Sequence, residues 1–359
     1  MKVAFLSPSY HPAIGGLETH LKHIAEKLAK QVNLEIYTYK NNFHVDDETE
    51  INGVRVRRFR TRRISYGIEI PSTELIDAVK NSDFDIIHLH SFHTLLPYFA
   101  RRCLHNSNQK LIITPHYHGG AHTFIRNILF TFYKPILAKI SQNADKIVCV
   151  SSYEKSLVMR DFRVDDDNVV VIPNGTDIKE SENVSNVSKD IRKVLFVGRL
   201  EKYKNIDKLV QAMKVLKDDG FTLTIVGDGS ARQELLKLIA KMDMEENVCI
   251  RSNLSREDLA NEYTSSNIFV MPSSYEAYGI AVAEALSFGL KVIVSDTNAL
   301  SEFVRAGYAQ GVPLPVTSDK IVRAILSSSK SNSSPRKYSP HTWDFVAKEL
   351  TQVYESVMN

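Results

Sequence analysis

Two glutamates, Glu276 and Glu284, lie eight positions apart in a stretch whose flanks predict a ligand site. The apolar run 268–271 before them has the length and composition of a short buried strand, and a helical pattern follows Gly279. The N–H groups and the dipole at such a helix start favour a phosphate. A carboxylate beside them can accept hydrogen bonds from two neighbouring hydroxyls. This combination is typical of a nucleotide-sugar site. The alternative is that both glutamates only make surface contacts.

A loop with two cations predicts a partner for a diphosphate. Arg199 and Lys204 follow the strand-like run 194–197 and precede a helical pattern that begins at Ile206. Two cations beside a helix start suit a diphosphate. Solvated surface cations are the alternative, which the strand, loop and helix context disfavours.

Two further candidates lie in the first half of the chain. Gly15 and Gly16 open a helical pattern after the apolar run 3–6, and glycine there lets the backbone approach a ligand closely. The pair is not a Gly-x-Gly-x-x-Gly fingerprint, which disfavours a dinucleotide site. His116 follows the strand-like run 110–114, at the end of a strand where α/β proteins bind ligands. A structural turn and a structural histidine are the alternatives.

Residues 272–302 resemble the signature of glycosyltransferase family 4, including its Glu-x7-Glu motif. In that family the second glutamate binds the nucleotide ribose and the first lies by the transferred sugar. The resemblance therefore implies a donor site that contains these residues: Gly15, Gly16, His116, Arg199, Lys204, Glu276, Tyr278, Gly279, Ile280 and Glu284. It further implies a role in the transfer itself for His116, Glu276, Arg199 and Lys204.

The chain departs from the family pattern at two places. Relatives commonly carry a glycine and contact the nucleobase where this chain has residues 251–253, and many have Gly-Gly where this chain has residues 297–299, before the glutamate that is Glu302 here. The nucleobase and the role of Glu302 therefore stay open.

The order of apolar runs predicts two α/β domains. Strand-like runs at 32–38, 85–89, 110–114, 146–150 and 168–172 alternate with helical or irregular segments, the pattern of a parallel sheet, and the alternation restarts at 194–197. The resemblance implies the GT-B fold, in which two Rossmann-like domains face each other across a deep cleft. We expect an acceptor-side domain at 1–178, a polar linker at 179–192 and a nucleotide-sugar domain at 193–341. A last helix at 342–359 is expected to pack back onto the first domain.

Composition narrows the class of protein. A net charge of +3 over 359 residues is too small to indicate a nucleic-acid binder. No apolar stretch has the length of a membrane span, the start lacks a signal-peptide pattern, and three isolated cysteines fit a reducing cytoplasm. We expect a cytoplasmic location, with attachment to the cytoplasmic face of the membrane as an open alternative.

Neither a metal nor another cofactor is expected. His88, His90 and His93 lack an acidic or cysteine partner at a spacing that would complete a metal site, so we interpret them mainly as scaffold. Asp83 and Asp85, and the run 165–167, are interpreted as solvated turn residues.

Two segments of the first half predict an acceptor that is anionic or lipid-linked. Residues 55–63 hold an anion-attracting cluster of Arg55, Arg57, Arg58, Arg60, Arg62 and Arg63. Residues 124–140 hold an apolar stripe of Phe124, Ile125, Ile128, Leu129, Phe132, Ile136, Leu137 and Ile140. Such a helix can lie on a membrane surface, but packing on the sheet is the favoured alternative. Pro135 is expected to kink or break it.

The resemblance implies a retaining, metal-independent glycosyltransferase that moves a hexosyl group from a nucleoside-diphosphate sugar to a glycan or lipid-linked acceptor. One alternative is a nucleotide-sugar epimerase of similar fold. Another is a non-catalytic nucleotide-sugar-binding subunit of a glycosylation complex.

Overall fold

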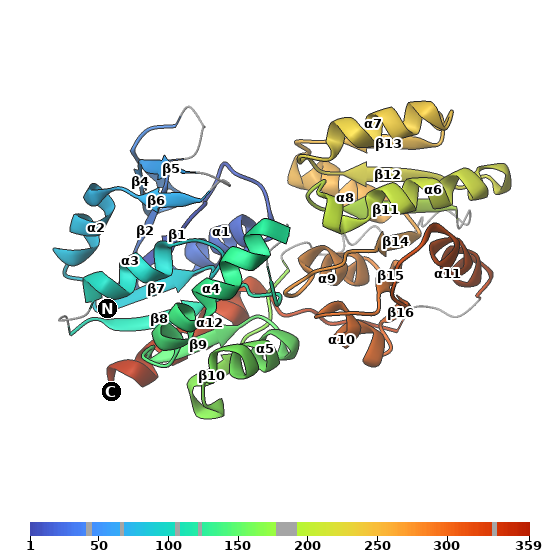
Figure 1. Ribbon diagram of the computed structural model, residues 1–359. Coiled ribbons are helices and arrows are strands. Elements are labelled where there is room, and N and C mark those ends of the chain that lie inside the picture. Colours follow the sequence, from blue (N-terminus) through green and yellow to red (C-terminus); the bar gives the residue numbers. More distant parts are fainter. Residues whose placement is uncertain (41–44, 65–67, 105–107, 121–123, 177–191, 332–335) are drawn as a thin grey trace. The chain divides into compact units, whose positions relative to one another are not determined.

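The computed structural model describes residues 1–40, 45–64, 68–104, 108–120, 124–176, 192–331 and 336–359, and the statements below refer to these residues (Figure 1). The chain divides into two compact units. Unit 1 contains Met1–Gly175 and His341–Asn359, and unit 2 contains Thr176–Pro340. Each unit has its own sheet and its own apolar core.

Unit 1 is built on an eight-stranded sheet with the order β10-β9-β8-β7-β1-β2-β4-β3. All neighbouring strands in it pair in parallel except β3 and β4. The central strands are buried on both faces, which explains why their residues are mainly apolar. Their bounds are β1 Lys2–Ser7, β2 Asn33–Tyr39, β3 Glu48–Ile51, β4 Val54–Phe59, β7 Ile86–His90, β8 Lys110–Thr114, β9 Lys146–Cys149 and β10 Val169–Val171; β5 Thr61–Arg63 and β6 Glu69–Pro71 form a separate small sheet.

Six helices surround this sheet: α1 Gly16–Leu28, α2 Thr73–Lys80, α3 Leu96–Cys103, α4 Phe124–Ser141, α5 Ser152–Phe162 and α12 Trp343–Met358. Pro135 lies inside α4 without ending it, so of the two expected effects, a kink or a break, the break is wrong.

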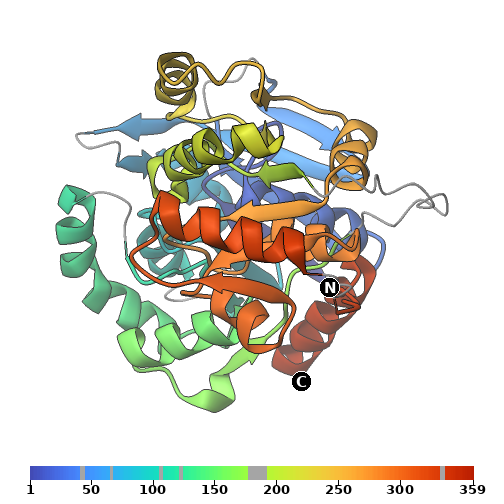
Figure 2. The same cartoon turned by 90° about the vertical axis from the view of Figure 1, so that its right-hand side faces the viewer.

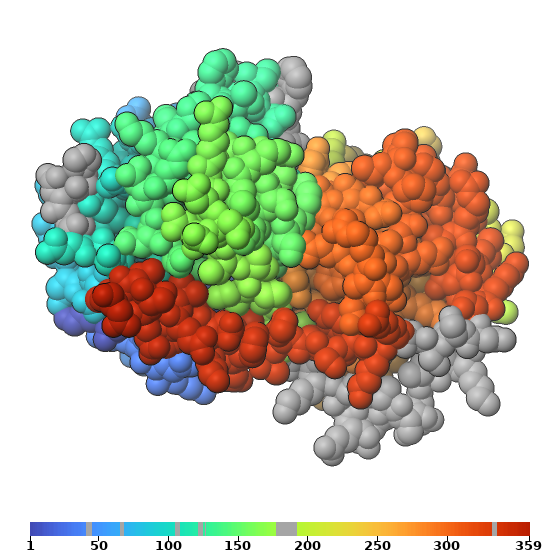
Figure 3. All heavy atoms as spheres, turned by 90° about the horizontal axis from the view of Figure 1, so that it is seen from below, coloured from blue at the N-terminus to red at the C-terminus, as the bar shows by residue number. Residues whose placement is uncertain are grey.

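The C-terminal helix α12 is part of unit 1, where it lies beside α1. Lys27 Nζ forms an ion pair with Asp344 at 2.7 Å, and the ring of His23 stacks on Trp343 with centroids 5.3 Å apart. Figure 3 shows α12 in red at the surface of this unit, next to the blue N-terminal residues.

Unit 2 is built on a six-stranded parallel sheet with the order β13-β12-β11-β14-β15-β16. Helices α6 and α11 lie side by side over one face of it (Figures 1 and 2), and α8 and α9 contribute aromatic and aliphatic side chains to the other face. The strands are β11 Lys193–Val197, β12 Thr222–Val226, β13 Val248–Arg251, β14 Ile268–Met271, β15 Lys291–Ser295 and β16 Ala309–Val312; the helices are α6 Ile206–Leu216, α7 Arg232–Lys241, α8 Arg256–Ser265, α9 Ile280–Ser287, α10 Leu300–Arg305 and α11 Ser318–Lys330.

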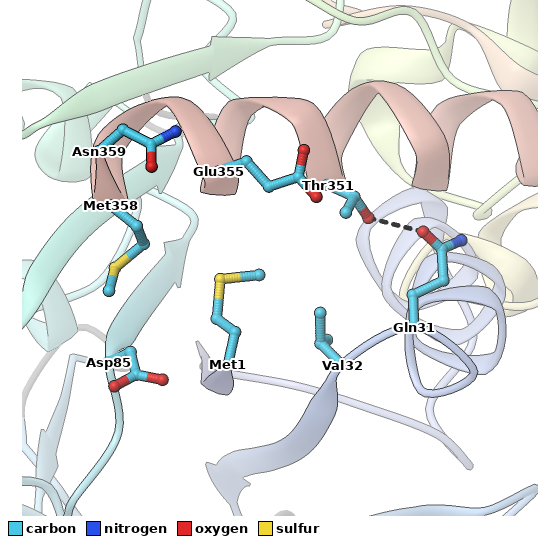
Figure 4. Close-up of a pocket in the computed structure, with 8 residues that line it drawn as sticks. All are labelled: Met1, Gln31, Val32, Asp85, Thr351, Glu355, Met358 and Asn359. Atoms are coloured by element: carbon cyan, nitrogen blue, oxygen red, sulfur yellow. Dashed lines mark hydrogen bonds between the residues drawn. The ribbon is translucent and has the colours of Figure 1, made fainter.

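A surface pocket of unit 1 lies at the amino ends of its central strands (Figure 4). Met1 and Asp85 directly precede β1 and β7, and Thr351, Glu355 and Met358 reach it from α12. Ligands of parallel α/β sheets bind at the opposite, carboxyl edge. This pocket is therefore not the predicted donor site.

Candidate functional site

The predicted donor-site residues of unit 2 lie at the carboxyl ends of β11 and β14 and at the start of α9. Close backbone packing shapes this edge of the sheet. A Cβ atom at Gly227, which follows β12, would lie 1.9 Å from Gly198 O, so only glycine fits there. The loops after neighbouring strands can consequently approach each other directly.

Lys204 and Glu276 form an ion pair at this edge. Their side chains keep only 8% and 14% of their exposure to solvent. Lys204 ends the 3-10 turn Lys202–Lys204 after β11, and Glu276 lies in the loop after β14. The sequence predicted both residues in the donor site, and the structure brings them into direct contact with each other.

Asn205 fixes the loop that carries Lys204. Its backbone is left-handed, with φ +53°, and it caps the start of α6. Its Nδ2 donates to Pro272 O at 2.8 Å and to Ser274 Oγ at 2.9 Å. These bonds tie the β11 loop to the β14 loop, so the two halves of the ion pair are held by a rigid frame.

Glu284 lies in the second turn of α9, where its Oε2 accepts a 2.7 Å hydrogen bond from the hydroxyl of Tyr263. Tyr263 comes from α8, is fully buried, and stacks on Phe288 with ring centroids 5.2 Å apart. Burial, together with the nearby Glu284 carboxylate, raises the pKa of Tyr263 well above its usual value. The hydroxyl therefore stays protonated and acts as the donor. Sequence reasoning missed Tyr263, because its contact with Glu284 spans 21 positions without a motif to mark it.

The residues between the two glutamates build the start of α9. Gly279 is its N-cap with φ +107°, a left-handed conformation that favours glycine, and Ile280 is the first helical residue. Tyr278 is buried, and its ring meets Phe303 edge to face at 5.8 Å. Its side chain thus anchors the turn within unit 2, whereas Gly279 and Ile280 offer backbone groups at the helix start.

Arg199 is exposed on the same loop as Lys204, and its Nη2 donates to the hydroxyl of Tyr203 at 3.2 Å. Its positive charge therefore lies in the open part of this edge, in contrast to the enclosed charge of Lys204. An exposed guanidinium can form paired hydrogen bonds to phosphate oxygens.

In unit 1, Gly15 and Gly16 begin α1 at the carboxyl end of β1. A Cβ atom at Gly16 would meet no atom within 4 Å. The fold of the unit itself therefore does not require glycine at Gly16, which is consistent with close approach of a ligand.

His116 lies two residues beyond β8, with a left-handed backbone at φ +48°. Its ring meets that of His20 edge to face, with centroids 4.8 Å apart, and it also lies near His90. Burial lowers the pKa of His116 well below its usual value, so the ring is neutral. Sequence reasoning missed His20 because it shares the buried face of α1 with apolar residues.

The structure separates the three histidines that the sequence analysis considered together. His88 Nδ1 is 2.7 Å from the hydroxyl of Tyr354 and its Nε2 is 2.8 Å from Thr114 Oγ1, as expected for a scaffold residue. His93 stacks on His118 with centroids 4.5 Å apart. His90 instead joins His20 and His116, and the ligand atoms of these three lie within 4.8 Å of one another.

The arginine cluster is only partly available to a ligand, which corrects the expectation from the sequence. Arg58 is buried and donates to Thr49 Oγ1 at 2.7 Å, and Arg55 and Arg57 form ion pairs with Glu48 at 3.1 Å and 2.9 Å. Arg55 stays exposed beside Glu48, and the remaining members are exposed as well: Arg60, Arg62 and Arg63.

The favoured interpretation of the apolar stripe also needs correction. Leu137 and Ile140 are buried in unit 1, but Phe132 is 77% exposed. The other exposed members are Ile125, Ile128, Leu129 and Ile136, whereas the side chain of Phe124 lies outside the described residues. Most of the stripe therefore faces away from the sheet. No described helix, α4 included, is both long enough and apolar enough to cross a membrane.

Comparisons with known proteins cover nearly the whole chain. Residues 14–180 match the family model "Glycosyltransferase Family 4", and residues 177–342 match "Glycosyl transferases group 1". An uncharacterized glycosyltransferase of Methanocaldococcus jannaschii is 27% identical, over 100% of this chain and 99% of that protein. The GDP-mannose:cellobiosyl-diphosphopolyprenol alpha-mannosyltransferase of Xanthomonas oryzae is 27% identical, over 90% of this chain and 85% of its own length.

Solved structures share the fold. A sucrose-phosphate synthase from Thermosynechococcus elongatus aligns with a TM-score of 0.82 and 21% identity, over 99% of both chains. Anabaena HepE, solved with UDP and glucose, aligns with a TM-score of 0.79 and 17% identity, over 99% of this chain and 100% of that one. At these identities the likeness is one of fold, two Rossmann-like domains with parallel sheets.

Proposed function

Because this chain belongs to glycosyltransferase family 4 and has the GT-B fold, we propose that it moves a hexosyl group from a nucleoside-diphosphate sugar to a glycan or lipid-linked acceptor. The observation that carries the proposal is the enclosed Lys204–Glu276 ion pair in the loops after β11 and β14, together with Glu284, which Tyr263 holds in the second turn of α9, the helix after the β14 loop. Such an edge combines cations for a diphosphate with carboxylates for sugar and ribose hydroxyls.

In this proposal each residue has a separate task. Arg199, Lys204 and the first turn of α9 hold the diphosphate and stabilise the charge that develops on it. Glu284, oriented by Tyr263, binds the ribose. Glu276 and His116 orient the transferred sugar.

The donor class also has support from relatives. HepE has been solved with UDP-glucose, and the Xanthomonas relative is named for GDP-mannose. The base and the sugar differ between these proteins, whereas a nucleoside diphosphate is common to both. We therefore propose this common class as the donor.

Transfer is proposed to retain the configuration of the sugar, as in the family. The bond between the anomeric carbon and the diphosphate oxygen breaks, and the acceptor oxygen bonds to the same face of the sugar. The acceptor proton passes to the departing diphosphate. This route requires leaving-group stabilisation and alignment from the protein, and Arg199 and Lys204 supply the positive charge that a metal ion supplies in other transferases.

The acceptor is proposed to be lipid-linked, with the protein attached peripherally to the cytoplasmic face of a membrane. The exposed apolar side chains of α4 and the exposed arginines of the β4–β5 segment support this, since apolar groups and cations together favour an anionic lipid surface. The name of the Xanthomonas relative includes a diphosphopolyprenol acceptor. A soluble glycan is the alternative.

Donor turnover with and without acceptors tests the proposed activity. A panel of nucleoside-diphosphate sugars is incubated with the protein in EDTA, alone and with polyprenyl-diphosphate saccharides or free glycans. A transferase gives a glycosylated acceptor and a nucleoside diphosphate, without a requirement for added Mg²⁺ or Mn²⁺. An epimerase would release an altered sugar without any acceptor, and a non-catalytic subunit would bind donor without turnover.

A further inference from the structure

Three histidines from separate elements of unit 1, two of them buried and one half-buried, lie close together. His20 comes from α1, His90 is the last residue of β7, and His116 follows β8. Their ring centroids are 4.8 Å apart for His20 and His116, 5.7 Å for His20 and His90, and 5.8 Å for His90 and His116. Imidazoles that share one tetrahedral ion, with metal–nitrogen bonds of about 2 Å, have centroids about 5 Å apart. The rings are thus spaced close to the distance that a common ligand needs.

Within the part of the chain that the structure describes, four nitrogens of these rings lack hydrogen-bond partners. His20 Nε2, both nitrogens of His90 and His116 Nε2 are buried and have no hydrogen-bond partner among the described residues. His20 and His90 as whole residues are only 3% and 0% exposed. A buried polar group without a partner costs about 1–3 kcal/mol, so several such atoms facing one another indicate a ligand.

Asn174 defines the tautomer of His20. Its Oδ1 lies 2.6 Å from His20 Nδ1 and can only accept, so Nδ1 carries the proton and Nε2 presents a lone pair. A ring N–H that donates to an oxygen is the arrangement which orients metal-binding histidines.

His88 allows a comparison with His90 on the same strand, since both are 0% exposed. His88, next to the cluster on β7, is equally buried, but both of its nitrogens have partners. Burial on β7 therefore does not by itself leave a histidine without hydrogen-bond partners, as the contrast between His88 and His90 shows.

We infer that His20, His90 and His116 form a binding site for one divalent transition-metal ion of the Zn²⁺ type, with Asn174 orienting His20. Three imidazoles suit Zn²⁺, Co²⁺ or Ni²⁺, whereas Mg²⁺ and Ca²⁺ require oxygen ligands. The ion would link α1 to the loop that carries His116. His116 is shared with the proposed function, in which it orients the sugar, but ion binding is measured without donor or acceptor, so its outcome is distinguishable from that of the proposed transfer.

Metal binding by untagged protein tests this inference. The protein is first stripped of metal with a chelator and then titrated with Co²⁺, whose binding is followed by the visible absorption of tetrahedral Co²⁺. In a second measurement the protein is loaded with Zn²⁺ and gel-filtered, and its Zn²⁺ content is measured by mass spectrometry. We expect one equivalent of ion per chain. His20→Gln and His90→Gln should weaken binding at least 100-fold, and Asn174→Ala by about 10–100-fold, the range for groups that orient a ligand.

His23→Gln is the matched control, since His23 lies on the same helix but stacks on Trp343 outside the cluster. It should bind the ion like the wild type. Circular dichroism shows whether each variant is folded. If the variants of the buried His20 and His90 do not fold, His116→Gln, in a loop, tests the site in their place. Absence of stoichiometric binding by folded wild type, or unchanged affinity in folded His116→Gln and His90→Gln, would overturn the inference.

Discussion

Lys204 Nζ donates a hydrogen bond to the carboxylate of Glu276, a contact between two loops that lie 72 positions apart in the chain. Both side chains are almost completely enclosed. Removing one member of such a pair leaves an uncompensated buried charge, which destabilises a protein by about 3–5 kcal/mol. If Lys204 holds the donor diphosphate, the diphosphate must either replace Glu276 as the partner of Lys204 or share Lys204 with it. The pair is thus a structural contact as well as a proposed functional one.

The first prediction separates the two roles of this pair. Lys204→Ala should weaken nucleoside-diphosphate affinity by tenfold or more, because it removes a charge-assisted contact worth about 1.5–3 kcal/mol. Glu276→Gln, which keeps an acceptor for Lys204, should mainly lower the rate of transfer. Calorimetric titration and initial rates measure these effects.

Thermal unfolding provides the control for this prediction. Lys204→Met combined with Glu276→Leu should melt closer to wild type than either single change, since no unpaired charge remains. Unchanged nucleotide affinity in a folded Lys204→Ala variant would contradict the assignment of Lys204 to the diphosphate.

The second prediction concerns Tyr263. Replacing it by phenylalanine removes the hydroxyl that orients Glu284 but keeps the ring stacked on Phe288. We expect about tenfold weaker binding of nucleoside diphosphates, the lower end for a hydrogen bond to a charged group. The loss should be smaller for a 2′-deoxynucleoside diphosphate, which has one hydroxyl fewer for Glu284. Tyr308→Phe, in the same unit, is the control, and equal losses for both sugars would argue against an orienting role.

Those parts of the fold that depend on the apolar pattern within a single segment could be predicted from the sequence. The central strands of unit 1 are parallel and buried, so β1 and β8 read as apolar runs, and β2 and β7 as mainly apolar ones, close to their observed bounds. The arginine-rich segment was harder. It forms β4, in which Val54 and Val56 face the core and the arginines make specific contacts, but charge density concealed this alternation.

The predicted site residues of unit 2 were recognisable because each lies in a strand–loop–helix unit with a local motif. What no motif reveals is which side chains contact each other. The contacts of Lys204 with Glu276, of Tyr263 with Glu284 and of His20 with Asn174 span 72, 21 and 154 positions. Such contacts depend on the order of strands in the sheet, which one sequence does not specify.

The third prediction concerns pH and Glu154, a fully buried carboxyl group in α5. It accepts from Tyr117 N at 2.5 Å, next to His116, and from Val150 N at 2.7 Å. Burial raises its pKa from 4.5 to about 8, although the two backbone N–H groups oppose the shift. The folded protein therefore holds a proton that the unfolded chain releases, and the free energy of unfolding should fall as pH rises from 4.5 to about 8.

Chemical denaturation across this pH range, on wild type and Glu154→Gln, measures the effect. The glutamine variant cannot titrate at this position, so its free energy of unfolding should depend less steeply on pH. Glu257→Gln, which alters an exposed residue of unit 2, is the control. Parallel pH dependences for wild type and Glu154→Gln would show that Glu154 stays ionised in the folded protein.

The fourth prediction tests membrane attachment through α4. Phe132→Asp should reduce binding to vesicles of anionic lipid by tenfold or more, since burial of a large apolar side chain contributes about 1.5–3 kcal/mol. Val215→Asp, at a 60% exposed valine of α6 in unit 2, is the matched control and should not change binding. Flotation of these vesicles through a sucrose gradient gives the measurement. Failure of the wild type to float even at low salt, where attraction between charges is strongest, would favour a soluble acceptor.

The last prediction is the stereochemistry of transfer. An inverting enzyme needs a general base beside the acceptor hydroxyl, and a double-displacement enzyme needs a carboxylate nucleophile on the opposite face of the sugar. Among the predicted site residues of unit 1, Gly15, Gly16 and His116 carry no carboxylate, and the ring of His116 lies against His20. Glu276, the predicted carboxylate nearest the sugar, is paired with Lys204. A front-face route, which draws on neither kind of group, therefore fits these residues best.

An α-linked donor should consequently give an α-linked product, and His116→Ala should slow transfer while nucleotide affinity in unit 2 stays unchanged. Proton NMR of the first product formed gives the anomeric coupling, before any slow rearrangement in water. The control is a donor of the opposite anomeric configuration, which the protein is expected not to consume. A β-linked product from an α-linked donor would rule out front-face transfer, because the incoming acceptor would then have attacked the face opposite the departing diphosphate.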